Sequence, residues 1–141
     1  MEQRISLITL GVQNLVVSRT FYEEMGFNAS GLSSKDVVFF QMKGVAVGLF
    51  QMDVLLAEQK LLGTKPVAGG ITIAYNTRSK EEVDSILEQA VTAGGTLLAS
   101  AKETPWGSYT GYFADPDGHS WEITWFEAFS PAEDGSVIFD D

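Results

Sequence analysis

Residues 79–95, with the sequence SKEEVDSILEQAVTAGG, form the stretch that decides the fold of this chain. Ser79 and Glu82 have the spacing of a capping box, in which the two side chains satisfy backbone N–H groups at a helix start. Gly94-Gly95 marks the helix end. Between these signals the apolar residues recur at helical spacing and predict one buried stripe: Val83, Ile86, Leu87, Ala90 and Val91.

The same signals occur 65 residues earlier (79 − 14), where Asn14 can cap a helix that ends near Gly26. Later the offset grows to 74 residues (118 − 44), which places the Asp117-Gly118 turn on the Lys43-Gly44 turn. Short β-branched or aromatic runs around these helices predict strands. They are Arg4–Val12, Val37–Met42, Val45–Gln51, Ile71–Thr77, Thr96–Ala101, Gly111–Ala114 and Trp121–Phe126, with a short helix at Asp53–Leu62.

This duplication predicts an α+β fold made of two tandem β-α-β-β-β modules, at about 4–52 and 70–126. We expect the modules to form a curled mixed sheet around a concave cavity, with the helices near 15–25 and 80–93 outside. The modules make one domain over residues 1–129. Residues 130–141 follow as an acidic C-terminal tail, for which a solvated tail is the favoured interpretation.

Composition excludes several classes of site. The 141 residues contain no cysteine and one histidine, which removes disulfides, thiolate nucleophiles, cysteine-ligated zinc and two-histidine sites. The net charge of −10 argues against nucleic acid and anionic membrane surfaces as partners. No apolar run approaches membrane-spanning length and no targeting signal is visible, so we expect a cytoplasmic protein.

Several motifs resemble a known family. They are Gly11–Leu15 (GVQNL) followed by Phe21-Tyr22 and Gly26-Phe27, then Pro105–Gly107 (PWG), and above all Phe113–Glu122 (FADPDGHSWE). In this order and spacing the sequence is similar to the vicinal oxygen chelate superfamily of glyoxalases, bleomycin-resistance proteins and extradiol dioxygenases. The resemblance extends from Arg4 to Phe126, nearly the whole chain.

The resemblance implies four metal-ligand positions, one on the first and one on the last strand of each module. They fall on Leu7, Gly48, Thr72 and Glu122. Only Glu122 offers a competent donor, and a single carboxylate does not hold zinc, iron or nickel against water. We therefore expect no metal and no other cofactor.

The expected cavity follows from strand alternation. Thr9, Phe50 and Thr124 share the period-two face of Leu7, Gly48 and Glu122, so all six side chains should point into it, together with Thr72. Trp106 and Tyr109 occupy a loop before the next strand, where they either close over a ligand or pack on their own domain.

Two polar residues leave alternatives open. Glu122 either binds substrate or acts as a base, or it is a structural carboxylate hydrogen-bonded to Thr72 or a tyrosine across the sheet. His119 follows a turn, which favours an exposed loop-tip histidine over a general base.

The leading hypothesis is a homodimeric protein that binds a small organic molecule, a drug or a metabolite, without a metal. The resemblance implies the dimer. The alternative is a lyase, isomerase or dioxygenase of the same superfamily, similar to lactoylglutathione lyase, in which Glu122 moves a proton.

Overall fold

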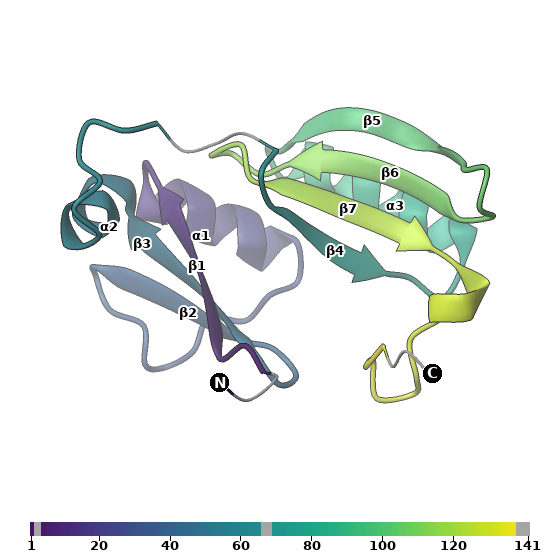
Figure 1. Cartoon of the computed structure of the whole chain (residues 1–141), viewed down its shortest axis with the longest axis horizontal. Coiled ribbons are helices and arrows are strands. Elements are labelled where there is room, and N and C mark those ends of the chain that lie inside the picture. The colour runs from purple at the N-terminus through teal and green to yellow at the C-terminus, as the bar shows by residue number, and fades with distance from the viewer. Residues whose placement is uncertain (2–3, 66–68, 138–141) are drawn as a thin grey trace. The chain divides into compact units, whose positions relative to one another are not determined.

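Two strand-and-helix units follow one another along the chain in the computed structural model, at residues 1–67 and 68–141 (Figure 1). The structure describes residues 1, 4–65 and 69–137. Each unit has its own sheet and its own buried side chains, and the predicted α+β fold class is confirmed. Among the described residues, no helix is long and apolar enough to cross a membrane.

The N-terminal unit consists of β1 (Leu7–Val12), α1 (Leu15–Glu24), β2 (Val37–Gln41), β3 (Ala46–Gln51) and α2 (Met52–Glu58). Its three strands lie in the order β1-β3-β2, with β1 parallel and β2 antiparallel to β3. Helix α1 packs on β2 and β3, while α2 packs on β1 and β3.

Helix α1 begins where the sequence predicts it. The side chain of Asn14 accepts hydrogen bonds from the N–H groups of Val16 and Val17, at 3.0 and 3.1 Å. The first backbone N–H groups of any helix have no acceptor within the helix, and two of them are satisfied here by Asn14. The helix buries Phe21 and Tyr22, and the Tyr22 ring lies 5.8 Å from the ring of Phe40 in β2. The core of this unit therefore lies between α1 and one face of its sheet.

The first module has one strand fewer than the predicted β-α-β-β-β pattern. Among the described residues, the segment between α1 and β2 forms only an isolated bridge, between Ala29 and Phe40. In the following segment the hydroxyls of Ser30, Ser33 and Ser34 accept hydrogen bonds from nearby backbone N–H groups. Such local bonds compete with a strand ladder, which explains why no fourth strand forms here.

The C-terminal unit consists of β4 (Thr72–Asn76), α3 (Lys80–Thr92), β5 (Thr96–Glu103), β6 (Tyr109–Ala114), β7 (Ser120–Trp125) and the 3₁₀ turn η1 (Glu127–Phe129). Its strand order is β4-β7-β6-β5. Strand β4 runs parallel to β7, and the other neighbouring pairs are antiparallel. This unit has the predicted β-α-β-β-β order.

Helix α3 confirms the predicted start and modifies the predicted stripe. The Ser79 hydroxyl accepts from the N–H of Glu82 at 3.2 Å, and the Glu82 carboxylate accepts from the N–H of Arg78 at 2.7 Å. Of the predicted stripe, Val83, Leu87 and Ala90 are buried and Ile86 is half-buried. The prediction that Val91 belongs to the core is wrong, because this residue is 47% exposed.

The two sheets share one pairing register. Leu7 pairs with Ala46 in the first sheet, and Thr72 pairs with Ser120 in the second. These pairs are related by the same offsets of 65 and 74 residues (72 − 7 and 120 − 46) that the sequence shows. The duplication is therefore confirmed for these two parallel strand pairs. The shared concave cavity that it suggested stays a prediction.

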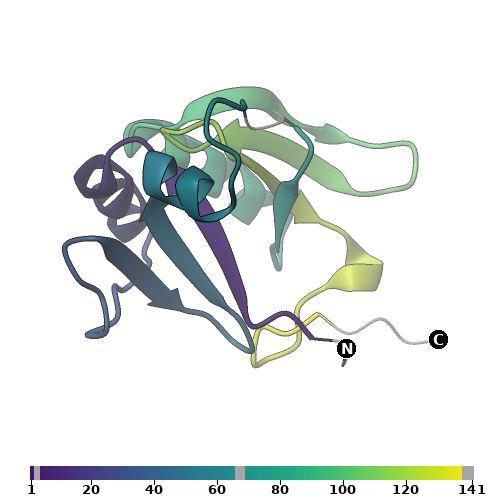
Figure 2. The same ribbon diagram turned by 60° about the vertical axis from the view of Figure 1, so that its left-hand side comes forward.

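The chain runs from β7 through η1 into the acidic tail (Figure 2). Both η1 and the beginning of the tail are hydrogen-bonded to the end of β4 and the residues after it. The Asn76 side-chain amide donates to the carbonyl of Phe129 at 3.0 Å, and the Arg78 guanidinium donates to the carbonyl of Ala132 at 2.8 Å. This part of the chain is therefore attached to the end of β4 rather than only solvated. The last acids of the tail, Asp140 and Asp141, lie outside the described residues.

Candidate functional site

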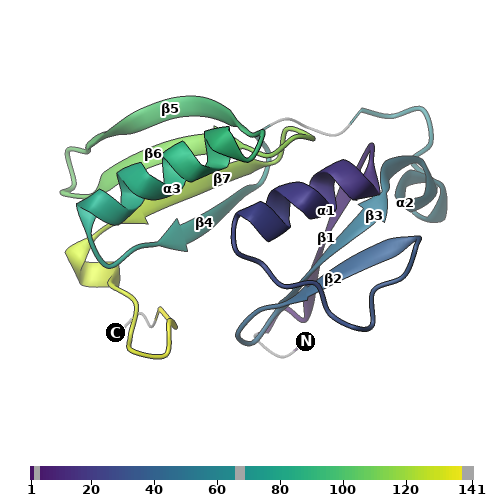
Figure 3. The same ribbon diagram turned by 180° about the vertical axis from the view of Figure 1, so that it is seen from behind.

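The four-stranded sheet has one face against α3, which packs on β5, β6 and β7 (Figure 3). Its opposite face, here called the open face, carries every second side chain of β4, β7 and β6. Strand β5 contributes at intervals of three residues because its register shifts twice. The strand register arranges these side chains in three rows. Across β4, β7, β6 and β5 the rows are Thr72-Ser120-Ala114-Thr96, Ala74-Glu122-Tyr112-Ala99 and Asn76-Thr124-Thr110-Lys102.

Glu122 and Tyr112 form the centre of the open face. The Tyr112 hydroxyl donates a hydrogen bond to Oε2 of Glu122 at 2.9 Å. Burial raises the pKa of Tyr112, and the hydrogen bond to the Glu122 carboxylate raises this pKa further. The phenol therefore stays protonated and holds the carboxylate in one orientation. Among the described residues, none donates to Oε1 of Glu122, and the small residues Ala74 and Ala99 lie at the two ends of this row.

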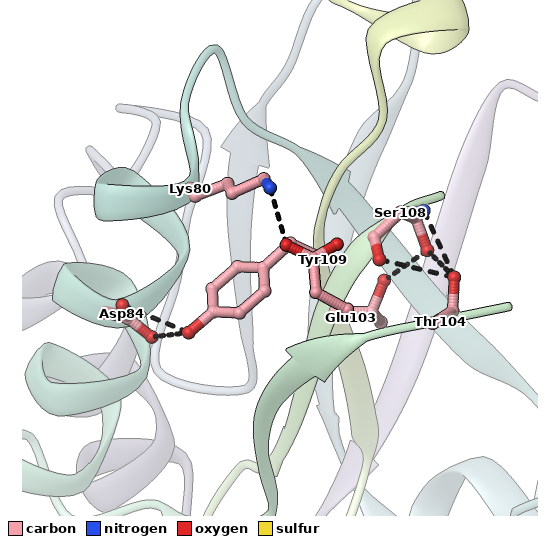
Figure 4. A network of polar contacts seen from close by, with 7 residues as sticks. Lys80, Asp84, Glu103, Thr104, Ser108 and Tyr109 are labelled. Carbon is pink, nitrogen blue, oxygen red and sulfur yellow. Dashed lines mark hydrogen bonds and ion pairs between the residues drawn. The ribbon is translucent and has the colours of Figure 1, made fainter. Parts of the chain in front are cut away.

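A chain of hydroxyl groups continues along one end of the open face. The side-chain oxygens of Thr124 and Thr110 are 2.6 Å apart, and those of Thr110 and Ser108 are 3.0 Å apart. The chain ends at Thr104, whose side-chain oxygen is 2.8 Å from that of Ser108 and also accepts the Ser108 N–H (Figure 4). These bonds fix the loop between β5 and β6. Trp106 lies in that loop and is 71% exposed.

Tyr109 does not lie with the other predicted site residues. It is the first residue of β6 rather than part of the loop, and it points to the face of the sheet that α3 covers. Its hydroxyl donates to the Asp84 carboxylate of α3, at 3.0 and 3.3 Å (Figure 4). This hydrogen bond is the first cause of the raised pKa of Tyr109, because it stabilises the protonated phenol.

The predicted residues of the first module share one face of the N-terminal sheet. This face, here called the α2 face, lies opposite α1 and carries Leu7, Thr9, Gly48 and Phe50. It is mostly apolar: Phe39 stands beside Gly48, and a Cβ at Gly48 would lie 3.4 Å from the Phe39 ring and 3.5 Å from Leu7. Thr9 supplies a hydroxyl. The α2 face of the first module and the open face of the second thus occupy equivalent positions, but the first is mostly apolar and the second is polar.

The residues at the implied metal-ligand positions do not fit a metal ion. In the C-terminal sheet Thr72 lies diagonally from Glu122, and Ala74 is the residue beside it. In the N-terminal sheet the equivalent positions are Leu7 and Gly48, which carry no donor side chain. Across residues 1, 4–65 and 69–137, no cluster of three or more His, Cys, Asp or Glu could hold a metal. A lone carboxylate does not hold a transition metal against water.

Two features of the site do not follow from the sequence reasoning. The structural alternative for Glu122 expects a hydrogen bond to Thr72 or to a tyrosine across the sheet, and the structure shows a tyrosine bond. The sequence reasoning did not name Tyr112 as that tyrosine, although the turn at Asp115–Gly118 places it opposite Glu122 in a hairpin. His119 is not the exposed loop-tip side chain that the turn favours. Its Nδ1 lies 2.7 Å from Oδ2 of the buried Asp115, whose other oxygen accepts the N–H groups of Asp117 and His119. The spacing of four residues between Asp115 and His119 is the signal that predicts such contact around a turn.

Comparison with known proteins gives a family match over most of the chain. The family model described as Glyoxalase/Bleomycin resistance protein/Dioxygenase superfamily matches residues 4–123. A protein of Mycobacterium bovis that is described as uncharacterized is 32% identical over 62 residues, which are 44% of this chain and 36% of that protein. The match thus spans about a third of the length of this curated relative.

Solved structures match over longer stretches. The crystal structure of a glyoxalase-related enzyme from Fulvimarina pelagi is 34% identical with a TM-score of 0.87, covering 99% of both chains. A hypothetical protein of S. aureus is 26% identical with a TM-score of 0.76, covering 89% of this chain and 95% of that one. A glyoxalase/bleomycin resistance protein/dioxygenase family enzyme from Burkholderia phytofirmans PsJN is 20% identical with a TM-score of 0.76, covering 85% and 96%, and shows the fold alone.

Proposed function

The chain belongs to the Glyoxalase/Bleomycin resistance protein/Dioxygenase superfamily, and from this premise we propose that it binds a small organic molecule, a drug or a metabolite, without a metal ion. The open face of the C-terminal sheet is the proposed binding surface. The observation that carries the proposal is the Glu122 carboxylate, held by Tyr112 at 2.9 Å with alanines at both ends of its row.

The chemistry of this surface defines the ligand class. Oε1 of Glu122 accepts hydrogen bonds, and the hydroxyls of Thr72, Ser120 and Thr124 accept or donate them. On β4 and β7, Glu122 is the one charged side chain of this face. A ligand that donates O–H or N–H groups, or that carries a positive charge, is therefore complementary to it. Carboxylate ligands are disfavoured next to Glu122.

An enzyme that uses Glu122 as a proton shuttle is the second candidate. A carboxylate oriented by a protonated phenol has the arrangement of a general base with a positioning partner. The resemblance to a structure described as a glyoxalase-related enzyme also favours catalysis. The two candidates differ in turnover, since the binding protein returns its ligand unchanged.

A thermal-shift screen of metabolites and antibiotics tests the proposal, with the metal content of the purified protein measured alongside. We expect a ligand that raises Tm for the native chain but not for Glu122→Gln. Glu58→Gln, which makes the same change of charge on α2, is the control and should respond like the native chain. Stoichiometric zinc, nickel or iron would overturn the metal-free proposal. A ligand hit that is converted to product supports the enzyme instead.

The proposal also includes Leu7, Thr9 and Phe50 of the α2 face and Trp106 as ligand contacts. It further includes assembly as a homodimer and a cytoplasmic location. The excess of 19 acidic over 9 basic residues supports a partner other than nucleic acid.

A further inference from the structure

A groove lies between α3 and β5, on the side of the C-terminal sheet opposite the open face. Its volume is about 610 Å³, which is within the range of small-molecule pockets. Apolar side chains from both elements line it: Leu87 and Val91 from α3, and Leu97 and Ala101 from β5. All of these residues belong to one unit, so the groove is complete within it.

Strand β5, which forms one side of the groove, pairs irregularly with its neighbour. Its pairing with β6 shifts register twice, between Leu97 and Ala99 and again between Ala99 and Lys102. On the helix side Leu87 is 5% exposed and lies over Gly111, where a Cβ would be only 2.5 Å from its Cδ1. Leu87 therefore forms a buried floor. Val91 and Leu97 remain 47% and 43% exposed and form apolar walls.

Two carboxylates give the groove its charge. Asp84 and Glu88 stand one turn apart on α3, and both line the groove. Within the part of the chain that the structure describes, no basic residue lines it. The nearest lysine along α3, Lys80, pairs with Glu103 (Figure 4). Its ammonium group also lies 5.0 Å from the centre of the Trp125 ring. The Tyr109 hydroxyl holds the Asp84 carboxylate in place without neutralising it.

We infer that this groove binds a small organic amine with an apolar body. Its ammonium group lies at Asp84 and Glu88, and its apolar part covers Leu87, Val91 and Leu97. The two carboxylates favour a cation, and the half-exposed side chains of Val91 and Leu97 favour an apolar chain attached to that cation. The site does not depend on the proposed function, because the sheet separates it from Glu122 and Tyr112.

A titration of the ¹⁵N-labelled full chain with octylamine, followed by amide chemical shifts, tests this inference. We expect saturable shifts confined to residues 84–101. Octanol and octanoate carry the same chain without the positive charge, and spermidine carries charge without an apolar body. Each of these compounds should bind at least about fivefold more weakly than octylamine. Octanol and octanoate lose the ion pair with Asp84 and Glu88, and spermidine loses the contact with the apolar walls.

The double variant D84N/E88Q should bind octylamine about fivefold more weakly, and L97S should also weaken binding. The amide oxygen that D84N introduces can still accept the Tyr109 hydroxyl, so the fold is preserved. The control E127Q/E133Q makes the same change of net charge outside the groove and should bind like the native chain. Equal binding of octanoate, equal binding by D84N/E88Q, or shifts outside 84–101 would overturn the inference.

Discussion

Replacing Gly111 by alanine should destabilise the C-terminal unit. The added Cβ would lie 2.5 Å from Leu87 Cδ1, 2.9 Å from the backbone nitrogen of Ala101 and 3.1 Å from its Cα. Carbon atoms in contact prefer about 3.5–4.0 Å, so Leu87 must move by about 1 Å and β5 must also shift. Overpacking of this kind costs about 1–3 kcal/mol, and the loss of glycine freedom in the unfolded chain offsets roughly 0.4–1 kcal/mol of it.

The net expectation for Gly111→Ala is a loss of about 1–2 kcal/mol and a fall in Tm of roughly 3–8 °C. Urea denaturation followed by tryptophan fluorescence measures it, because Trp106, Trp121 and Trp125, the three tryptophans of the chain, all belong to this unit.

The matched control is Gly48→Ala, followed by far-UV circular dichroism. Its added Cβ would meet Phe39 and Leu7 at 3.4–3.5 Å, which is ordinary contact, so stability should change by less than about 0.5 kcal/mol. Equal effects of the two variants would refute the reasoning, because it rests on the approach of the Ala101 backbone.

Four further outcomes are expected. Asn14→Ala should lower stability by about 1 kcal/mol in thermal melts, because two helix N–H groups lose their acceptor; an unchanged Tm would contradict this role. The raised pKa of Tyr112 means that the folded state holds the phenolic proton more tightly, so its contribution to stability is complete below pH 10.0 and declines as the pH rises through the folded pKa. Denaturation across this range should show a smaller decline for Tyr112→Phe, and Glu122→Gln should lower the pKa of Tyr112 only in part because burial remains. Phe50→Ala should weaken any ligand found by the screen, and unchanged affinity would remove the α2 face from the site. Light scattering should give twice 15.3 kDa, whereas a monomer mass would exclude the homodimer.

Local patterns predicted most of the helices and strands. Asn14 and Ser79 cap helices where expected, because capping depends on a few neighbouring backbone groups. The missing strand in the first module was not predicted, because it depends on serine hydroxyls that bond to nearby backbone rather than on hydrophobic alternation. The spacing of Val91 fits the predicted core stripe, but the residue is exposed. Spacing along a helix does not indicate how far the sheet that covers the helix extends.

Residue types that recur at fixed offsets were enough to predict the duplicated fold from the sequence, whereas the loss of metal donors, which rests on the family resemblance, stays a prediction. Only the tertiary structure decided which side chains meet. It placed Tyr112 on Glu122, turned Tyr109 to Asp84 on the other face and joined His119 to Asp115. Such contacts depend on strand register and on the sheet face that a helix covers, and both arise when distant segments pack. The groove between α3 and β5 has the same origin, since its lining residues come from a helix and a strand that meet only when distant parts of the unit pack.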